Sequence, residues 1–230
     1  LSRPSISEQV SSRILAMIKS GNLKAEDRLP TEQQMCLAFG ISRPPLREAL
    51  KALTLIGILE SKQGGRYMVT DLSPTRLVTP FNVLLSVADH DLQVQFEARA
   101  VVELELVRFC TERASDEQCA RILSLGNDGL TFYHDPIGFR LLDVEYHQAI
   151  NAGANNTILA TISDGLYNVA IDARRIASAT PGVIEISTHQ HCRVAEAIAA
   201  RDTGEAVKAY REHLDHVLET TIRAIHELSE

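Results

Sequence analysis

The stretch "TEQQMCLAFGISRPPLREALKAL" (31–53) predicts two short helices joined by a tight turn. Thr31 has a glutamine three places on, the capping-box pattern that opens a helix, and Gly40 ends that helix. Ser42 stands at the N-cap of the second helix, whose first turn holds two prolines where a missing N–H costs little. This order predicts a helix–turn–helix.

The segments on either side complete a small domain. Before the helix–turn–helix, apolar residues recur at helical spacing over 10–18. After it, two strand-like runs over 58–61 and 66–69 flank the turn sequence "KQGG". A helix, a helix–turn–helix and a hairpin in this order predict a winged helix-turn-helix domain over residues 1–71.

The remainder of the chain is predicted to be helical. The sequence "DLSPTR" predicts a linker, which we place at 72–79, and strand signals nearly vanish after it. Residues 80–230 are therefore expected to form an all-α antiparallel helical bundle, which makes the fold class mainly α. The expected helices lie near 76–87, 91–113, 116–132, 136–152, 155–179, 183–201 and 203–228.

The charges of the 230-residue chain are distributed unevenly around a net charge of −7. Residues 1–71 carry 10 lysines and arginines against 7 aspartates and glutamates, whereas the remaining residues carry 13 against 23. An excess of positive charge permits a polyanionic partner, and an excess of negative charge disfavours one. The N-terminal segment is thus the part expected to bind nucleic acid.

The sequence lacks the signals of a membrane or secreted protein. No window approaches the roughly 18 apolar residues of a membrane span, and the N-terminus has no basic-then-apolar signal pattern. The four cysteines form no CxxC pair, which argues against a zinc ribbon or a disulfide framework. We expect a cytoplasmic protein with no membrane partner.

The second helix of the helix–turn–helix carries the candidate DNA-reading residues. In this motif it lies in the major groove, where an arginine fork on guanine is the commonest specific contact. Arg43 and Arg47 are four residues apart and share a face, while the first-turn N–H groups suit a phosphate. A solvated basic face is the alternative, but the order of elements and the charge balance favour DNA. The candidate contacts are Ser42, Arg43, Arg47 and Lys51 on the helix, with Lys62 and Arg66 in the wing.

One aspartate and three of the eight histidines are predicted to face the core of the bundle. On helical wheels they lie within or beside the apolar stripes of three different helices: Asp143, His147, His191 and His213. Buried charges must be paired or bound to a metal, and imidazole with carboxylate suits zinc, nickel, iron or manganese. A single buried histidine is more simply a core residue with a hydrogen bond. The four together favour a metal site with room for a water or an effector oxygen.

The N-terminal segment resembles the GntR family of bacterial transcription regulators over residues 7–71. The motifs that carry the resemblance are "GNLKAEDRLPTE", "ISRPPLREALKAL" and "GGRYMV". The resemblance implies a winged helix-turn-helix that binds a double-stranded DNA operator. By position it implies that Ser42, Arg43 and Arg47 read the operator, with Gln63 and Gly64 at the wing tip.

The chain departs from the family pattern at three places. The family's Pro-Gly before the Leu-Pro is Ala25-Glu26 here, a change within a turn. Gln33 stands where many members have a DNA-contacting arginine, and Pro44 stands where a threonine or serine often follows the arginine. The last two departures leave the operator sequence open.

Residues 80–230 resemble the FCD ligand-binding domain of the FadR-type GntR subfamily. The motifs are "DVEYHQAI", "HCRVAEAIAARD" and "AYREHL". In that subfamily the aspartate and histidine of the first motif, with one histidine from each of the others, bind a divalent metal. By position these are the same four residues that the helical wheels select. Members without a metal lack these histidines, so the chain resembles the metal-bearing branch, with zinc as the expected ion.

The resemblance also implies a small carboxylate effector, often a sugar acid or a hydroxy acid, bound at the metal with help from an arginine. Arg99 falls at the position of that arginine, within "EARAVVELE". Arg99 and Glu103 are also four apart on a helix that is apolar almost all round, so a structural ion pair explains them equally well. Arg174 and Arg175 are further candidates for anion binding, and a solvent-facing helix would explain both equally well.

These observations predict a ligand-responsive DNA-binding regulator, acting as a repressor and as a homodimer on two half-sites, and not an enzyme. The effector must then bind differently to two states that differ in DNA affinity. One alternative is a metalloenzyme, but it leaves the N-terminal domain without a role, and the sequence marks no general base. Another is a metal-responsive repressor, which differs only in what is sensed.

Overall fold

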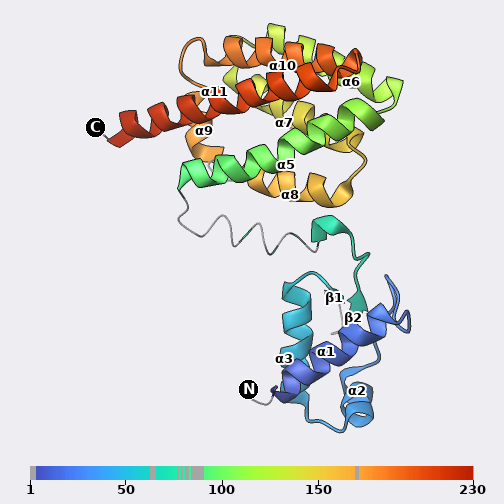
Figure 1. Cartoon of the computed structure of the whole chain (residues 1–230). Helices are drawn as coiled ribbons and strands as arrows, with labels where there is room; N and C mark the ends of the chain where they lie inside the picture. Colours follow the sequence, from blue (N-terminus) through green and yellow to red (C-terminus); the bar gives the residue numbers. More distant parts are fainter. Residues whose placement is uncertain are drawn as a thin grey trace. The chain divides into compact units, whose positions relative to one another are not determined.

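The computed structural model describes residues 4–62, 66–76, 91–168 and 171–229, together with the single residues 78, 80 and 83. Contacts within the chain divide it into two compact units, Leu1–Val83 and Leu84–Glu230. The first contains a winged helix-turn-helix, and the described elements of the second are all helical (Figure 1). The predicted fold class is confirmed.

The first unit has its elements in the order predicted from the sequence. They are α1 (Ile6–Lys19), α2 (Glu32–Phe39), α3 (Arg43–Leu55), β1 (Leu59–Lys62) and β2 (Arg66–Val69). Capping boxes at Ser5 and Thr31 open α1 and α2, because each hydroxyl accepts a hydrogen bond from the N–H three residues on. Helix α2 ends at Gly40, whose φ of 66° lies in the left-handed region that glycine adopts at low cost.

The core of this unit lies between its helices and the hairpin. The most deeply buried side chains are apolar residues of α1, α3 and both strands: Ile14, Leu46, Leu50, Leu53, Leu59 and Val69. The strands β1 and β2 pair antiparallel, with Leu59 opposite Val69. The expected wing-tip residues Gln63 and Gly64 lie outside the described part of the chain.

The turn between α1 and α2 contains a non-glycine residue in the left-handed region. Glu26 has a φ of 68°, and its N–H donates to the carbonyl of Val69 in β2 at 3.0 Å. A side chain in this region costs roughly 1–2 kcal/mol, a cost that glycine avoids. Glu26 stands where the GntR pattern has glycine, so this departure falls on a residue whose backbone favours glycine.

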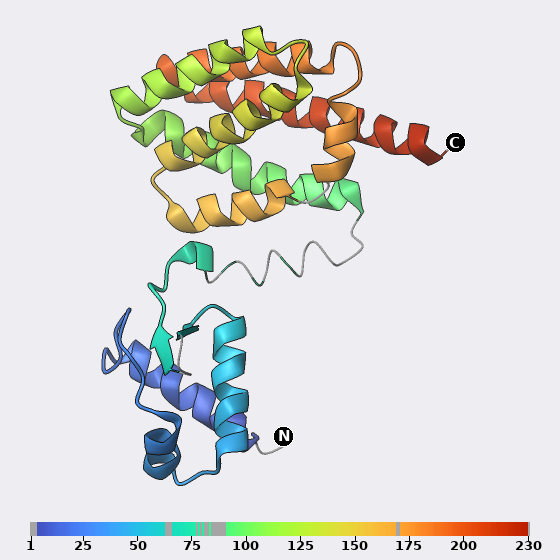
Figure 2. The ribbon, with the colours of Figure 1, turned by 180° about the vertical axis from the view of Figure 1, so that it is seen from behind.

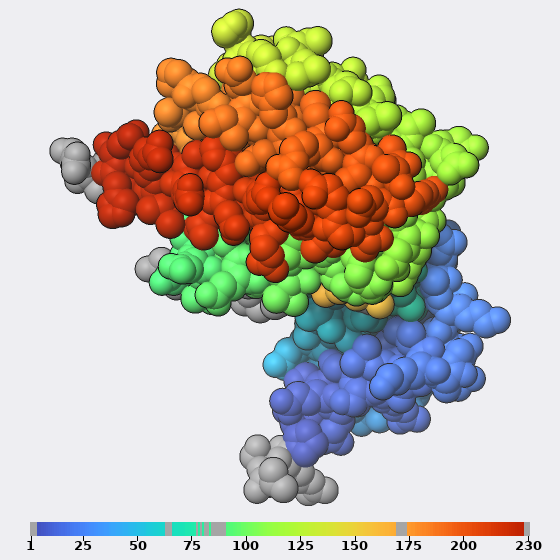
Figure 3. Space-filling model, turned by 45° about the horizontal axis from the view of Figure 1, so that its top comes forward, coloured from blue at the N-terminus to red at the C-terminus, as the bar shows by residue number. Residues whose placement is uncertain are grey.

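The second unit is a bundle of helices. They are α5 (Leu92–Arg113), α6 (Asp116–Asp128), α7 (Pro136–Gly153), α8 (Thr157–Asn168), α9 (Ile171–Ala177), α10 (Val183–Ala199) and α11 (Thr203–Ser229). Helix α11 packs against α5, α9 and α10, while α7 packs against α5, α6 and α8 (Figure 1). The exposed sides of α10 and α11 form much of one face of this unit (Figure 3). A core of apolar residues from α5, α6, α7, α10 and α11 joins these helices.

Two of the predicted helices differ in the structure. The single helix expected over 155–179 is wrong, because α8 and α9 run in different directions (Figure 2). Helix α8 packs against α5, whereas α9 packs against α11, so each follows its own partner. The helix expected over 116–132 ends as α6 at Asp128, and the 3₁₀ turn η1 (Gly129–Thr131) follows it.

The predicted linker (72–79) lies mostly within the described residues, whereas the helix expected over 76–87 falls in large part outside them. Pro74, Thr75 and Arg76 are helical, so part of the predicted linker is a helical turn. The domain boundaries at 1–71, 72–79 and 80–230 remain a prediction. Within the described ranges, no helix combines the length and the apolar character needed to cross a membrane.

Candidate functional site

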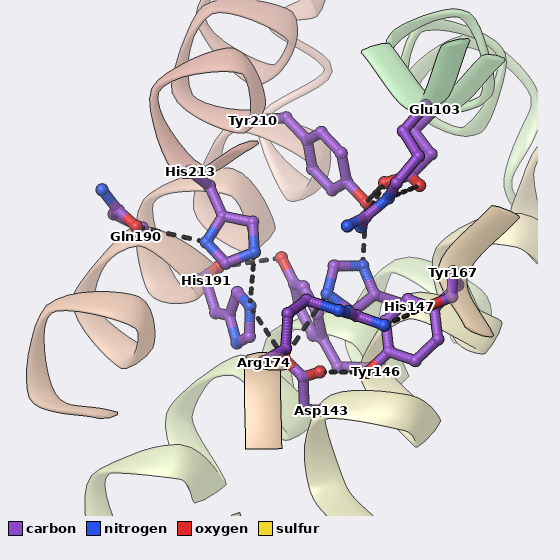
Figure 4. A network of polar contacts seen from close by, with 11 residues as sticks. Glu103, Asp143, Tyr146, His147, Tyr167, Arg174, Gln190, His191, Tyr210 and His213 are labelled. Carbon is purple, nitrogen blue, oxygen red and sulfur yellow. Dashed lines mark hydrogen bonds and ion pairs between the residues drawn. The ribbon is translucent and has the colours of Figure 1, made fainter. Parts of the chain in front are cut away.

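The four predicted metal ligands come together in the second unit. Helix α7 supplies Asp143 and His147 one turn apart, α10 supplies His191, and α11 supplies His213; their side chains point toward one another (Figure 4). The Nε2 atoms of His147 and His191 each lie 3.5 Å from Asp143 Oδ1. His191 Nε2 and His213 Nε2 are 3.3 Å apart. The three histidines are buried, and each offers a nitrogen within 4.8 Å of the others.

Hydrogen bonds on the outer nitrogens determine which way two of the imidazoles present their lone pairs. His213 Nδ1 lies 3.1 Å from the Gln190 amide oxygen, which can only accept, so this nitrogen carries the proton. His147 Nδ1 lies 2.8 Å from the Tyr210 hydroxyl, which itself donates to Glu103 Oε2 at 2.9 Å. The hydroxyl therefore accepts from His147. When each ring carries one proton, on Nδ1, both Nε2 atoms thus present lone pairs to the centre of the cluster.

The electrostatics keep Asp143, His191 and His213 in the protonation states that metal binding requires. Burial lowers the pKa of His191 to about 3 and the pKa of His213 well below its ordinary value, so both rings are neutral. Burial alone would raise the pKa of Asp143, but the neighbouring His147 and His191 and the Tyr167 hydroxyl together lower it well below its usual range. Neutral imidazoles with outer N–H groups hydrogen-bonded, beside a carboxylate, form a donor set that fits a divalent transition metal.

A cavity of about 100 Å³ adjoins this cluster. One part of its wall consists of Asp143, His147 and His213. Another part consists of basic side chains, which are Arg99, Arg140, Arg174 and Arg175. Two buried guanidinium nitrogens, Arg99 Nη1 and Arg174 Nε, have no hydrogen-bond partner among the described residues. Because buried donors are rarely left unpaired, these two N–H groups suit an anionic ligand oxygen.

Arg99 is both an ion-pair partner and a cavity residue. Its two predicted roles, effector contact and structural ion pair, are therefore not exclusive. Its Nε and Nη2 atoms donate to the two oxygens of Glu103 at 2.7 and 3.2 Å, and both side chains are almost completely buried. Burial would raise the pKa of Glu103, but Arg99 beside it lowers that pKa below its ordinary value. The third nitrogen, Nη1, remains free for a ligand.

Arg174 also lies at the cavity, and burial lowers the pKa of its guanidinium. The guanidinium stacks 4.1 Å from the centre of the Tyr167 ring and donates to the Tyr167 backbone carbonyl. The neighbouring Arg175 is exposed although it contributes to the cavity wall. The structure thus gives Arg174 the more enclosed of the two positions.

Three residues around the cluster, Gln190, Tyr210 and Tyr167, were not singled out from the sequence, and Glu103 was named only as the ion-pair partner of Arg99. Glu103, Gln190 and Tyr210 hold ligand or arginine side chains, and Tyr167 donates its hydroxyl to Asp143 Oδ2. Burial raises the pKa of Tyr167, so the hydroxyl keeps its proton. Tyr210 stands one turn before His213 within "AYREHL", a spacing that marks it as a neighbour. No local signal marks Tyr167, because it lies where a single long helix was expected.

The predicted DNA-reading residues lie at the start of α3. Ser42 occupies the N-cap position, but within the described chain its side chain makes no capping hydrogen bond, contrary to the expected cap. The hydroxyl is therefore available to a ligand. Arg43 and Lys51 are exposed. Arg47 Nε donates to Glu32 of α2 at 2.9 Å while its side chain stays 58% exposed, so it is partly committed within the domain.

The wing carries a second group of positive charges. Arg28, Lys62 and Arg66 line a hollow of about 470 Å³ together with Tyr67 and Met68. Arg28 precedes α2 in the chain and bridges to Met68 of β2, which explains how it joins the wing. Sequence reasoning missed Arg28, because only the pairing of the chain before α2 with the hairpin brings it there.

A winged helix-turn-helix followed by a helical domain with a buried polar site defines a DNA-binding regulator with a sensor domain. Comparison with known proteins agrees. Residues 6–69 match the model of the bacterial regulatory proteins of the gntR family, and residues 95–216 match that of the FCD domain. The chain belongs to the GntR family of bacterial transcription regulators, with an FCD domain of the FadR type.

Three bacterial regulators align with nearly the whole chain. The uncharacterized HTH-type transcriptional regulator YcbG of Bacillus subtilis is 30% identical over 99% of this chain and 94% of its own length. The putative L-lactate dehydrogenase operon regulatory protein of Escherichia coli is 31% identical, covering 95% and 87%. The HTH-type transcriptional repressor NanR of Cronobacter sakazakii is 31% identical, covering 96% and 86%.

The solved structure of a GntR protein from Streptococcus agalactiae has the same fold. It superposes with a TM-score of 0.60 at 23% identity, covering 93% of this chain and 99% of that one. The matching families and relatives are transcription regulators and not enzymes, so the metalloenzyme alternative is set aside. The protein is a DNA-binding regulator whose FCD domain is its effector-binding domain.

Proposed function

We propose that a small carboxylate, bound at a metal in the FCD domain, sets the affinity of this regulator for its operator. The observation that carries the proposal is the convergence of two groups on one cavity. Asp143, His147 and His213 line one part of its wall, and Arg99 and Arg174 line another with unpaired N–H donors. A carboxylate has oxygens for both groups.

The proposed metal ligands are Asp143, His147, His191 and His213. Three imidazoles and one carboxylate suit zinc first, with nickel, iron or manganese as other ions of matching preference. When bound, such an ion supplies a positive charge that attracts an effector oxygen. Gln190 and Tyr210 hold the outer nitrogens of two ligands, the supporting contacts that orient metal-binding histidines.

The proposed effector is a sugar acid or a hydroxy acid. The cavity of about 100 Å³ accommodates only a small molecule, and its arginines favour an anion. One relative's name refers to an L-lactate dehydrogenase operon, and lactate is a hydroxy acid. Another relative is named a repressor, which supports repression as the mode of action here.

The proposed DNA-binding surface comprises the start of α3 and the wing. Its residues are Ser42, Arg43, Arg47 and Lys51 of α3, with Lys62, Gln63, Gly64 and Arg66 of the wing, and Arg28 beside it. We propose that a homodimer presents two such surfaces to two half-sites, in the cytoplasm where the operator lies.

Metal analysis and native mass spectrometry of the purified protein test the sensor site. We expect one divalent ion per chain and a small acid that stays bound with it. A gel shift on DNA upstream of the protein's own gene then tests response, with the metal and L-lactate titrated separately. Release of DNA by metal alone would support the metal-responsive alternative, and the absence of sequence-selective binding would sink the regulator mechanism.

A further inference from the structure

The two carboxylate oxygens of Asp143 have different partners. Oδ1 lies 3.5 Å from the Nε2 atoms of His147 and His191, at the centre of the cluster. Oδ2 accepts a hydrogen bond from the Tyr167 hydroxyl (Figure 4). Tyr167 comes from α8, a helix that supplies no ligand to the proposed site. Tyr167, which is not one of the proposed metal ligands, therefore engages Oδ2, while Oδ1 faces the histidines.

Tyr167 is itself held in place from several directions. The guanidinium of Arg174 lies 4.1 Å from its ring centre, and that of Arg99 lies 5.6 Å away. Arg174 also donates to the backbone carbonyl of Tyr167, and the ring lies 5.4 Å from the ring of His147. These contacts restrain the ring, so the direction of the hydroxyl toward Asp143 is determined by packing as well as by the hydrogen bond.

We propose that Tyr167 is a positioning residue that makes Asp143 a one-oxygen ligand and thereby keeps a coordination position open for an effector oxygen. The inference rests on the proposed metal site. A carboxylate can bind a metal through one oxygen or through both. A hydrogen bond to Oδ2 stabilises the one-oxygen mode, because it occupies a lone pair of Oδ2 and holds that oxygen toward Tyr167. Without it, Oδ2 would compete for the position that the effector needs.

The open position would face the cavity that the arginines line. Asp143, His147, His213 and Tyr167 all contribute to its wall, together with Arg99 and Arg174. A carboxylate in this cavity can place one oxygen at the metal and the other near the unpaired guanidinium nitrogens. By holding Oδ2, Tyr167 thus limits Asp143 to one coordination position and leaves another to the effector oxygen.

The substitution Tyr167→Phe tests this role, since it keeps the ring and removes only the hydroxyl. The full chain is loaded with Co²⁺, whose visible absorption reports its coordination, and acetate is titrated as the simplest carboxylate. We expect Co²⁺ to bind within a few-fold of wild type. The acetate-induced spectral change should need about tenfold more acetate, the scale expected for one hydrogen bond to a charged group.

Tyr133→Phe is the matched control, because Tyr133 stacks on His189 and does not line this cavity. It should respond to acetate as wild type does. An unchanged acetate response in Tyr167→Phe overturns the proposal, as does a loss of Co²⁺ affinity beyond about 100-fold, the upper range for supporting residues. Wild type that binds Co²⁺ without any acetate response also overturns it. Failure of wild type to bind Co²⁺ would instead refute the metal site of the proposed function.

Discussion

Gln190 and Tyr210 determine which ring nitrogen carries the proton in His213 and His147, respectively. Each engages an outer ring nitrogen, which leaves the inner nitrogen with a lone pair. The periodicity of the sequence placed the histidines correctly, since apolar stripes identify the inward faces of helices. It could not predict the partners of the outer nitrogens, because each partner lies on a different helix from its histidine. At the scale of residues, the sequence therefore predicts which histidines are buried better than it predicts their hydrogen-bond partners.

His191→Ala should lower divalent metal affinity by at least about 100-fold, more than the loss of a supporting hydrogen-bond partner causes. His189→Ala is the matched control on the same helix, because His189 is exposed and contacts its own helix carbonyl at Glu185. Competition with a coloured chelator measures both affinities. Equal affinities for the two variants would show that His191 is not a ligand.

The buried, neutral state of His191 has a consequence for stability. Its pKa is about 3 in the folded protein against an ordinary value of 6.5, so the unfolded chain takes up a proton that the folded chain does not. The stability that neutral His191 contributes to the metal-free protein is therefore fully present above about pH 6.5. It is lost progressively as the pH falls from there toward 3.

Urea unfolding of wild type and His191→Ala between pH 7.5 and 5.5 measures this effect, with metal removed by chelator. The wild-type midpoint should fall more steeply with acidification than that of the variant. Parallel slopes for the two proteins would mean that His191 titrates normally in the folded state.

At the scale of elements, helix starts were predictable and one break was not. Capping boxes at Thr31 and Ser115 mark helix starts in the sequence, and both form in the structure. Gly165 lies three residues before the end of α8, but an isolated glycine within a helical pattern does not by itself predict where a helix ends. Packing of α8 on α5 and of α9 on α11 determines it instead. Arg174 lies over the Tyr167 ring although it belongs to the next helix, α9.

Glu26→Gly should stabilise the winged helix-turn-helix by about 0.5–1 kcal/mol, because the left-handed backbone of Glu26 carries a cost that glycine avoids. Ala25→Gly is the control: Ala25 is not among the described residues with positive φ, so this change should be neutral or destabilising. Chemical unfolding followed by circular dichroism measures both. A destabilised Glu26→Gly variant would show that the side chain, and not the backbone, matters at this turn.

At the scale of the whole molecule, the uneven distribution of charge follows the division into a DNA-binding domain and an effector-binding domain. The segment with excess positive charge contains the winged helix-turn-helix, and the segment with excess negative charge contains the FCD domain. The sequence therefore predicted the class of protein and the family. The cavity beside the metal ligands could not be predicted, since it depends on how six helices pack, and neither the effector nor the operator follows from the sequence.

The most direct test of the account is the operator affinity of the metal-loaded protein, measured by fluorescence anisotropy while hydroxy acids and sugar acids are titrated. We expect one such acid to weaken operator binding by about tenfold or more, a typical allosteric coupling. This response should vanish in His191→Ala, which keeps its basal affinity, whereas Arg43→Ala should lose operator affinity without losing metal. An acid response that persists unchanged after metal removal and in His191→Ala would contradict the account.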